Sequence, residues 1–421
     1  MSTTSLIDDP NKLLIFINDC LKPKDVEKKQ FGEVFTPMVL VNEMLDKLPI
    51  DVWSNKNLKW FDPCCGMGNF PVAIYLRLME GLKHKIKNIQ NRKTHILQNM
   101  LYMSELNKKN VFICKQIFDI HNKYNLNIYQ GDTLQLDIKK IFNVDKFDII
   151  VGNPPYQEVS EKGISKGGTN LYTKFINISF NILQQNGYLV FITPISWLGP
   201  SINIQTGNDL LHNIFLKYDV LYLNITECKK YFNVGSSFSY YVIQKTITKN
   251  IITHIVSEYK KQIEQSYIDL KQYNNLKFLP IHLTENTIKL VNDIISKQNT
   301  LKINRCRILD TSTKYGKTHL NKIKDTNFKY ITYHTSTITY YSDIKLSIYD
   351  DVKILLNMSG YLMPTICTNC NITESKFYII TTEHDAQNII NLLNSNKITQ
   401  YLELCKYSGF NSRIVLESIS Y

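Results

Sequence analysis

The residues best suited to chemistry are Asn153-Pro154-Pro155-Tyr156, which follow the apolar run Ile149–Val151. The run predicts a buried strand, and two successive prolines end it because they fix φ and lack an N–H group. The strand therefore leads into a stiff elbow, at the edge where open α/β sheets bind ligands. The Asn153 side-chain oxygen and the Pro154 carbonyl can accept both hydrogen bonds of an exocyclic amine, while Tyr156 stacks on the flat base that carries it. These residues are predicted to be catalytic, and a plain turn is the alternative for the motif alone.

A glycine-rich turn is the second candidate site. A predicted strand at Leu58–Asp62 enters the turn, and a predicted helix at Val72–Met79 leaves it. Gly66 and Gly68 allow a ligand to approach the backbone closely. The turn is neither a phosphate loop nor a full dinucleotide fingerprint, since no Lys-Ser/Thr follows and a proline takes the third glycine position. S-adenosylmethionine (AdoMet) fits such a turn, with its carboxylate at the helix start and its ammonium group paired with Asp62.

Two acids follow the next predicted strands. Strands are expected at Leu101–Glu105 and Leu126–Gln130, and Glu105 and Asp132 stand at or just after their carboxyl ends. Glu105 is placed to accept hydrogen bonds from ribose hydroxyls, and Asp132 from an adenine amino group. A lone acid at such a place is usually a helix cap, but two in successive turns favour a shared ligand.

The segment before the first strand holds a further candidate. Thr36-Pro37 begins a predicted amphipathic helix at Met38–Leu48, with Thr36 at the cap and proline at the first helical position. Phe35 and Thr36 are expected to close over the ligand, and a simple helix cap is the alternative.

The order of the remaining elements predicts an α/β sheet followed by a region of different character. The sheet region is expected to hold a basic polar loop at 81–99, a helix at 171–183 and strands at 149–151, 187–194, 219–225 and 239–244. Residues 1–30 are expected to form an N-terminal helical leader. From residue 251 the expected elements are a helix at 284–296, a strand at 352–358 and a last helix at 383–393.

Charge and cysteine usage narrow the class of protein. The 421 residues carry 49 Lys and Arg against 37 Asp and Glu, and the net charge of +12 favours a polyanionic partner such as nucleic acid. Nine scattered cysteines, without a signal peptide or an apolar run of membrane-spanning length, predict free thiols and a cytoplasmic protein. Cys367 and Cys370 form a single C-x-x-C without a second pair, so a zinc site is not expected there.

Three segments in this order resemble one enzyme family. Phe31–Pro37, Asp62–Phe70 and Asn153–Tyr156, followed by a basic C-terminal region, resemble the AdoMet-dependent DNA adenine-N6 methyltransferases of type II restriction–modification systems. The order of the segments is that of the gamma-type, TaqI-like branch. The resemblance covers about residues 31–245 and is weak beyond them.

The resemblance implies both a fold and a set of site residues. It implies a seven-stranded, Rossmann-like AdoMet-binding domain over residues 31–250, with the final strand antiparallel, and an α+β DNA target-recognition domain over 251–421. It implies that Asn153, Pro154, Pro155 and Tyr156 hold a flipped adenine, with Phe232 as the second stacking ring. The residues that it assigns to AdoMet are Phe35, Thr36, Asp62, Cys64, Gly66, Gly68, Glu105 and Asp132. The cysteine pair and Met67 depart from the small residues usual in the glycine turn.

The expected function is site-specific methylation of adenine N6 in double-stranded DNA by a monomer that needs neither metal nor membrane. Two alternatives stay open: a methyltransferase of the same motif that acts on RNA or a protein glutamine amide, and a DNA-binding protein with an inactive core. A fused nuclease is not expected, because the 30 residues before the first motif are too few for a nuclease core. The sequence leaves open whether a cognate restriction endonuclease exists and whether the source is cellular or viral.

Overall fold

The computed structural model describes residues 6–9, 36–156, 159–160, 163–164, 171–200, 209–225, 231, 237–295 and 299–421. The chain divides into two compact units. Unit 1 comprises Met1–Ile195 and Asn203–Asn275, and unit 2 comprises Ser196–Ile202 and Leu276–Tyr421. Of the expected leader helix, only residues 6–9 are described, with a short 3-10 turn at Leu6–Asp8, and the rest lies outside the described residues.

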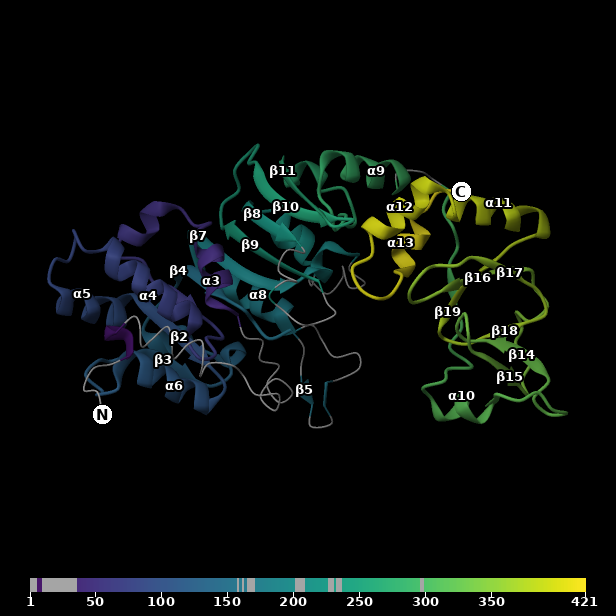
Figure 1. Ribbon diagram of the computed structural model, residues 1–421, viewed down its shortest axis with the longest axis horizontal. Coiled ribbons are helices and arrows are strands. Elements are labelled where there is room, and N and C mark those ends of the chain that lie inside the picture. The colour runs from purple at the N-terminus through teal and green to yellow at the C-terminus, as the bar shows by residue number, and fades with distance from the viewer. Residues whose placement is uncertain are drawn as a thin grey trace. The chain divides into compact units, whose positions relative to one another are not determined.

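Unit 1 is built on a nine-stranded mixed sheet in the order β11-β10-β8-β9-β7-β4-β1-β2-β3 (Figure 1). Its strands are β1 (Trp60–Asp62), β2 (Leu101–Glu105), β3 (Asn127–Gln130), β4 (Phe147–Gly152), β7 (Leu183–Pro194), β8 (Asp219–Ile225), β9 (Phe238–Gln244), β10 (Thr253–Tyr259) and β11 (Gln262–Ile268). Its helices are α3 (Met38–Leu45), α4 (Asn69–Gly81), α5 (Ile89–His95), α6 (Lys108–Asp119), α7 (Ile138–Phe142) and α8 (Leu171–Ile182). A separate two-stranded ribbon pairs β5 (Val159–Ser160) with β6 (Gly163–Ile164).

The predicted α/β class is confirmed. β9 lies antiparallel between β7 and β8, as expected for the last strand of a seven-stranded sheet, while β1, β2, β3, β4 and β7 pair in parallel. The sheet is larger than predicted by two strands, because β10 pairs in parallel with β8 and then forms an antiparallel hairpin with β11.

Both faces of the central parallel strands β1, β2 and β4 are buried, which explains their largely apolar sequences. In β1, Trp60 joins a core cluster with residues of α3, α4 and α6, and it stacks on Trp53 at 4.7 Å between ring centroids. Because side chains alternate along a strand, Phe61 faces the other side, where it stacks on Phe147 at 4.5 Å. The carboxyl ends of these strands are thereby held in fixed register at one edge of the sheet.

Two expectations for unit 1 are corrected. Residues 81–99 include helix α5 and lead into the π-helix Ile96–Met100, where a loop was expected. Its apolar side chains Ile96 and Leu97 are buried, and the basic residues around them hid this short pattern. The domain boundary expected after residue 250 falls before the β10–β11 hairpin, whereas the compact unit extends to Asn275. Lys260 and Lys261 form the hairpin turn with positive φ, a conformation for which Asn-Gly is the usual signal.

Unit 2 has the expected α+β character. Two four-stranded sheets run in the orders β12-β19-β16-β17 and β13-β15-β14-β18. The strands are β12 (Asn304–Arg305), β13 (Leu320–Asn321), β14 (Tyr330–Tyr333), β15 (Thr339–Ser342), β16 (Lys353–Asn357), β17 (Thr365–Cys367), β18 (Asn371–Ile372) and β19 (Lys376–Ile380). The helices are α9 (Glu285–Ile295), α10 (Lys314–Thr318), α11 (Glu383–Leu393), α12 (Asn396–Leu404) and α13 (Arg413–Glu417), so α11 is not the last helix as predicted.

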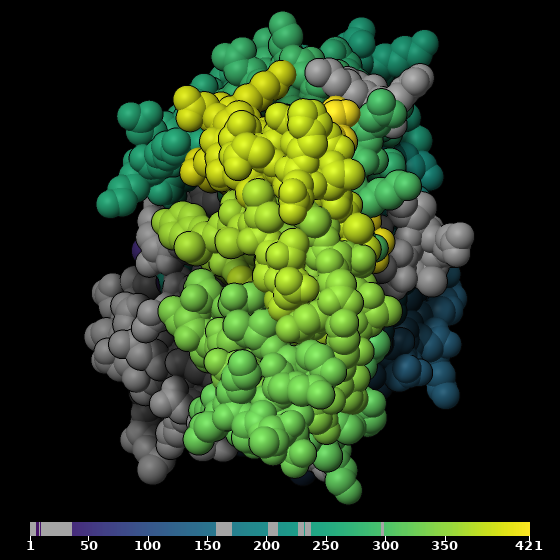
Figure 2. All heavy atoms as spheres, turned by 90° about the vertical axis from the view of Figure 1, so that its right-hand side faces the viewer, coloured from purple at the N-terminus to yellow at the C-terminus, as the bar shows by residue number. Residues whose placement is uncertain are grey.

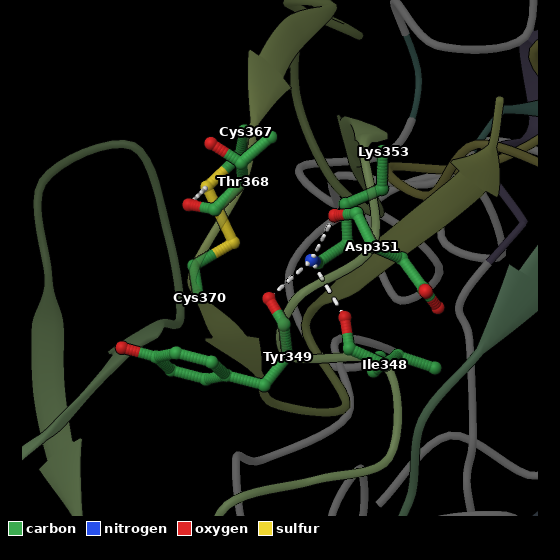
Figure 3. The surroundings of a disulfide bond; sticks show 7 residues. All are labelled: Ile348, Tyr349, Asp351, Lys353, Cys367, Thr368 and Cys370. Atoms are coloured by element: carbon green, nitrogen blue, oxygen red, sulfur yellow. Dashed lines mark hydrogen bonds between the residues drawn. A yellow bond between two sulfur atoms is a disulfide. The ribbon is translucent and has the colours of Figure 1, made fainter. Parts of the chain in front are cut away.

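A buried lysine and a disulfide lie close together in unit 2 (Figure 3). The Lys353 side chain has no exposed surface, and its Nζ donates to the carbonyls of Ile348, Tyr349 and Asp351 at 2.7, 3.1 and 2.8 Å. Burial lowers the pKa of this ammonium group. Cys367 and Cys370 form a disulfide with Cα atoms 6.7 Å apart, so the expectation of free thiols is wrong for this pair. A C-x-x-C spacing lets the two side chains meet, and spacing alone does not give their oxidation state.

No helix within the described ranges is both long enough and apolar enough to cross a membrane.

Candidate active site

Asp62 ends β1 and is 2% exposed. Its Oδ1 accepts a hydrogen bond from the Cys64 backbone N–H at 3.1 Å, and its Oδ2 has no hydrogen-bond partner among the described residues. Burial, together with the neighbouring Glu105 carboxylate, raises the pKa of Asp62 to about 8. A buried carboxylate with a bare oxygen is unfavourable unless a donor or a cation reaches it. The carboxylate therefore suits the ammonium group for which the sequence analysis selected it.

The glycine turn has the conformation that its glycines permit. Gly66 and Gly68 have φ values of +53° and +95°, which L-residues with side chains rarely adopt. A Cβ added at Gly68 would also lie 3.2 Å from the Cys114 sulfur. Gly68 is the N-cap of α4 and provides no side chain for the cap, which leaves the first N–H groups of this 13-residue helix available to an anion.

Glu105 connects β2 to the glycine turn. Its two carboxylate oxygens accept hydrogen bonds from the backbone N–H groups of Gly66 and Asn107 at 2.8 and 2.7 Å. The structure thus places Glu105 beside the turn and fixes its side chain. Each oxygen has a second lone pair, so a ribose hydroxyl can still donate to it.

Asp132 follows β3 and is exposed. Its Oδ1 accepts from the Leu134 backbone N–H at 2.9 Å, which makes it the N-cap of the short helix Thr133–Gln135. The capping alternative is therefore present, and adenine binding by Asp132 stays a prediction.

The Asn153 amide contacts the cofactor-side segment. Its Nδ2 donates to the Thr36 hydroxyl oxygen at 2.9 Å, and its Oδ1 accepts from the Tyr156 hydroxyl at 2.6 Å. The Thr36 contact orients the amide so that its oxygen faces Tyr156. Asn153, Pro155 and Tyr156 are half-buried and Pro154 is buried. The four residues predicted to be catalytic therefore form a fixed elbow attached to Thr36.

Gly152 brings the two predicted sites into contact. A Cβ at this position would lie 3.0 Å from Asp62 Oδ1 and 3.4 Å from Cys64 Sγ. Any larger residue would push the elbow at Asn153–Tyr156 away from the carboxylate. Sequence reasoning missed this role, because β1 and β4 are 85 residues apart and only their parallel pairing makes the contact visible.

Asn69, the first residue of α4, is a further site residue that the sequence analysis did not select. Its Nδ2 donates to the Thr36 carbonyl at 2.8 Å, and the residue is 8% exposed. Its Oδ1 has no hydrogen-bond partner within the described part of the chain. A second buried acceptor without a donor thus belongs to the same turn as Asp62. Its position directly after Gly68, at the open helix end, was the available signal.

Aromatic side chains complete the described surroundings of the elbow. The Tyr156 and Phe238 rings lie 5.0 Å apart with an interplanar angle of 42°. Two residues further along β9, the Tyr240 hydroxyl donates to Glu43 Oε1 at 2.7 Å, and the Tyr231 hydroxyl donates to Oε2 at 3.1 Å. Glu43 therefore fixes helix α3, which begins just after Thr36, to the strand that carries Phe238. Phe35 and Phe232, both predicted site residues, lie outside the described residues.

A family comparison covers the part of the chain that holds Glu105, Asp132 and Asn153–Tyr156. Residues 82–220 match the family described as Eco57I restriction-modification methylase. Over these residues the chain is similar to the Eco57I restriction-modification methylases. The predicted resemblance to restriction–modification methylases is thereby confirmed for residues 82–220, which run from just after α4 to the start of β8.

The chain is also similar to named relatives and to solved structures. An uncharacterized adenine-specific methylase of Mycoplasma pneumoniae is 25% identical over 61% of this chain and 76% of its own. The type II methyltransferase M.AccI of Acinetobacter calcoaceticus is 26% identical over 71% of this chain and 55% of its own, so the chain spans about half of that enzyme. The DNA complex of the type IIL restriction-modification enzyme MmeI superposes with a TM-score of 0.63 at 13% identity, over 94% of this chain and 69% of that one. At this identity the structural match establishes the fold alone.

Proposed function

We propose that this methylase domain transfers the methyl group of AdoMet to N6 of an adenine held outside a DNA duplex, as the modification half of a restriction–modification system. The observation that supports this proposal most strongly is that Asn153 lies beside the motifs expected to bind the cofactor, through its hydrogen bond to Thr36 and the close approach of Gly152 to Asp62. The name of the Mycoplasma pneumoniae relative supports adenine as the target, and the MmeI–DNA complex supports DNA as the substrate.

The site residues fit AdoMet. Asp62 Oδ2 and Asn69 Oδ1 are buried acceptors without donors, as an ammonium ligand requires. The open N-terminus of α4 suits its carboxylate, and Glu105 suits the ribose hydroxyls. Phe35, Thr36, Cys64, Gly66, Gly68 and Asp132 are proposed to line the remainder of this site. When bound, the cofactor supplies an electrophilic methyl group on a positively charged sulfur.

The residues of the elbow then act on the base. An adenine inside a duplex cannot present N6 to a methyl donor, so it must leave the stack. The Asn153 oxygen and the Pro154 carbonyl accept the two N6 hydrogens, which frees the nitrogen lone pair to form the N–C bond as the C–S bond breaks. The extra N6 proton then leaves to water, so no strong base is required. Tyr156 stacks on the adenine, and Pro155 stiffens the elbow.

The Tyr156 hydroxyl must share or give up the Asn153 oxygen when the base enters. In the structure this hydroxyl donates to Asn153 Oδ1, the same atom that the adenine amine needs. An amide oxygen accepts two hydrogen bonds, so the ring can swing onto the base while the amine takes the freed direction. Phe238, which touches Tyr156 in the structure, limits how far the ring can turn.

The deciding test is methylation of nucleic acid by the purified chain. Unmethylated plasmid is incubated with labelled AdoMet, digested to nucleosides and analysed by mass spectrometry, and N6-methyldeoxyadenosine is expected at a defined set of sites. Parallel reactions contain RNA and a glutamine-bearing protein substrate. A label that appears only in RNA or protein would replace the proposed acceptor, and bound AdoMet without any transfer would identify an inactive core.

A further inference from the structure

A short segment of unit 2 carries half of the net charge of the chain. Residues 302–329 hold eight Lys and Arg residues and two acids, an excess of six against +12 for all 421 residues. This basic segment runs from just before β12, through α10 and β13, to the start of β14. The charge density is therefore local, and a general excess of lysine does not account for it.

Seven of these eight basic side chains are exposed: Lys302, Arg307, Lys314, Lys317, Lys322, Lys324 and Lys329. Within the described part of unit 2, the ion pairs involve other groups, and none of these seven takes part in one. In Figure 2 the green atoms of this part of the chain cover the lower part of the visible face of unit 2.

The two acids of the segment accept hydrogen bonds from groups of the loops that contain them. Asp310 Oδ1 accepts from the backbone N–H and the hydroxyl of Ser312 at 2.8 and 2.6 Å. Asp325 Oδ1 accepts from the N–H groups of Asn327 and Phe328 at 2.8 and 2.7 Å. These carboxylates fix the backbone that presents the lysines, since one oxygen of each accepts two hydrogen bonds there.

The backbone of the segment is held by further contacts. The Thr313 hydroxyl oxygen caps α10 by accepting from Gly316 N–H at 3.0 Å, and β13 pairs with β15. Lys317 on α10 and Lys322 and Lys324 just after β13 thus project from a defined frame. Ion contacts from a preformed frame cost less ordering than contacts from a free tail.

We propose that the basic segment 302–329 is a phosphate-contact surface that positions duplex DNA without reading its sequence. The proposal rests on the proposed function, which makes DNA the substrate. Six of the seven exposed cations are lysines, which act as point charges on phosphate oxygens, whereas the planar fork of arginine suits the recognition of guanine. Contacts to phosphates fix register and orientation and carry no base information.

The test compares two triple variants that remove the same charge. K317Q/K322Q/K324Q alters the segment, and K277Q/K289Q/K397Q removes three exposed lysines elsewhere in unit 2. Binding of the intact chain to labelled duplexes of about 30 base pairs, with and without a methylation site, is measured from roughly 50 to 300 mM NaCl. Thermal unfolding checks that both variants fold.

We expect K317Q/K322Q/K324Q to bind both duplexes roughly 10- to 100-fold more weakly at physiological salt, with a salt dependence shallower by about 2 to 3 in log–log slope. The control should stay within about threefold of wild type. Equal losses in both variants would reduce the effect to overall charge and overturn the proposal. Loss confined to the duplex with the site would make the segment a base reader and overturn it as well.

Two further outcomes separate this proposal from the proposed function. Unchanged DNA binding by K317Q/K322Q/K324Q, together with lost binding to polyglutamate, would indicate an acidic protein partner and overturn the phosphate surface alone. A wild-type chain that binds neither duplex would overturn the proposed function together with this inference.

Discussion

Asp62 in unit 1 and Lys353 in unit 2 both hold an ionisable group away from water, and their surroundings differ in one respect. Lys353 donates three hydrogen bonds to three carbonyls, so its ammonium group is fully satisfied. Asp62 accepts one hydrogen bond at Oδ1 and has a bare Oδ2 among the described residues. Lys353 therefore completes a local fold, while Asp62 keeps an unused acceptor that suits a ligand. A buried ionisable group indicates a binding site when part of its hydrogen-bonding capacity is unused.

Asn153→Ala should give the largest effect on the unit 1 side of this comparison. Removing the amide deletes an acceptor for the adenine amine and the partner of Thr36, and we expect turnover to fall roughly 1,000-fold. Because Asn153 is half-buried, the free energy of unfolding should change by less than about 1 kcal/mol. Single-turnover kinetics measure the fall in turnover, and calorimetry measures AdoMet binding separately. Substantial turnover by the variant would contradict the assigned amine activation.

Lys353→Met tests the unit 2 side of this comparison, the buried and fully hydrogen-bonded ammonium group. Three buried carbonyls lose their donor, and we expect unit 2 to be destabilised by about 3 kcal/mol in chemical denaturation. AdoMet affinity should stay within about twofold of wild type, and K345M is the matched control because it removes an exposed lysine paired with Asp350. If Lys353→Met unfolds like wild type, the satisfied ammonium group has no structural role.

Asp62→Asn should weaken AdoMet binding roughly 10- to 100-fold, since the neutral amide cannot pair with an ammonium group. In wild type, the pKa of about 8 keeps Asp62 mostly protonated at pH 7 without ligand. Binding of a cation lowers that pKa, so binding at pH 7 should release up to one proton. Calorimetry in two buffers of different ionisation enthalpy measures the release, and equal heats in wild type would show that this carboxylate does not meet the ammonium group.

The raised pKa of Asp62 also predicts how the free energy of unfolding changes with pH. A folded-state pKa above the unfolded value means that the stabilisation from protonated Asp62 is complete below about pH 4 and is lost as pH rises towards 8. Asp62→Asn should remove this slope, so the variant gains stability relative to wild type across that window. Thermal unfolding at several pH values without AdoMet measures it.

Thr36→Val should have the smallest effect. The substitution removes the acceptor that orients the Asn153 amide while it keeps the size of the side chain, and we expect turnover to fall about tenfold. Thr36→Ser retains a hydroxyl and should restore most of the rate. Equal rates in all three proteins would mean that the Asn153 orientation does not depend on Thr36.

The sequence predicted those parts of the site that have a local signature. Asp62, the two glycines and Asn153-Pro154-Pro155-Tyr156 stand next to strong strand and turn signals, and the structure places them at the carboxyl ends of β1 and β4. The partners of Lys353 are backbone carbonyls, which every residue has, so no side-chain pattern marks them. The contact of Gly152 with Asp62 depends on parallel pairing between distant strands and is equally invisible.

The β10–β11 hairpin shows a different limit. Residues 262–267 of β11 are mostly exposed, so the strand shows no alternation of buried and exposed apolar residues. Its Lys260-Lys261 turn also lacks the usual residues for positive φ. Without either signal, the change of composition after residue 250 gave a boundary about 25 residues too early.

The assignment of Ser196–Ile202 to unit 2 constrains how related chains can recombine. This segment belongs to unit 2 with Leu276–Tyr421, and the Leu279 N–H donates to the Leu198 carbonyl at 2.9 Å. A chimera made by a single crossover near residue 275 would join a foreign C-terminal part to the resident 196–202 segment. Exchange of unit 2 as a folded unit therefore requires both pieces of the chain to be replaced together.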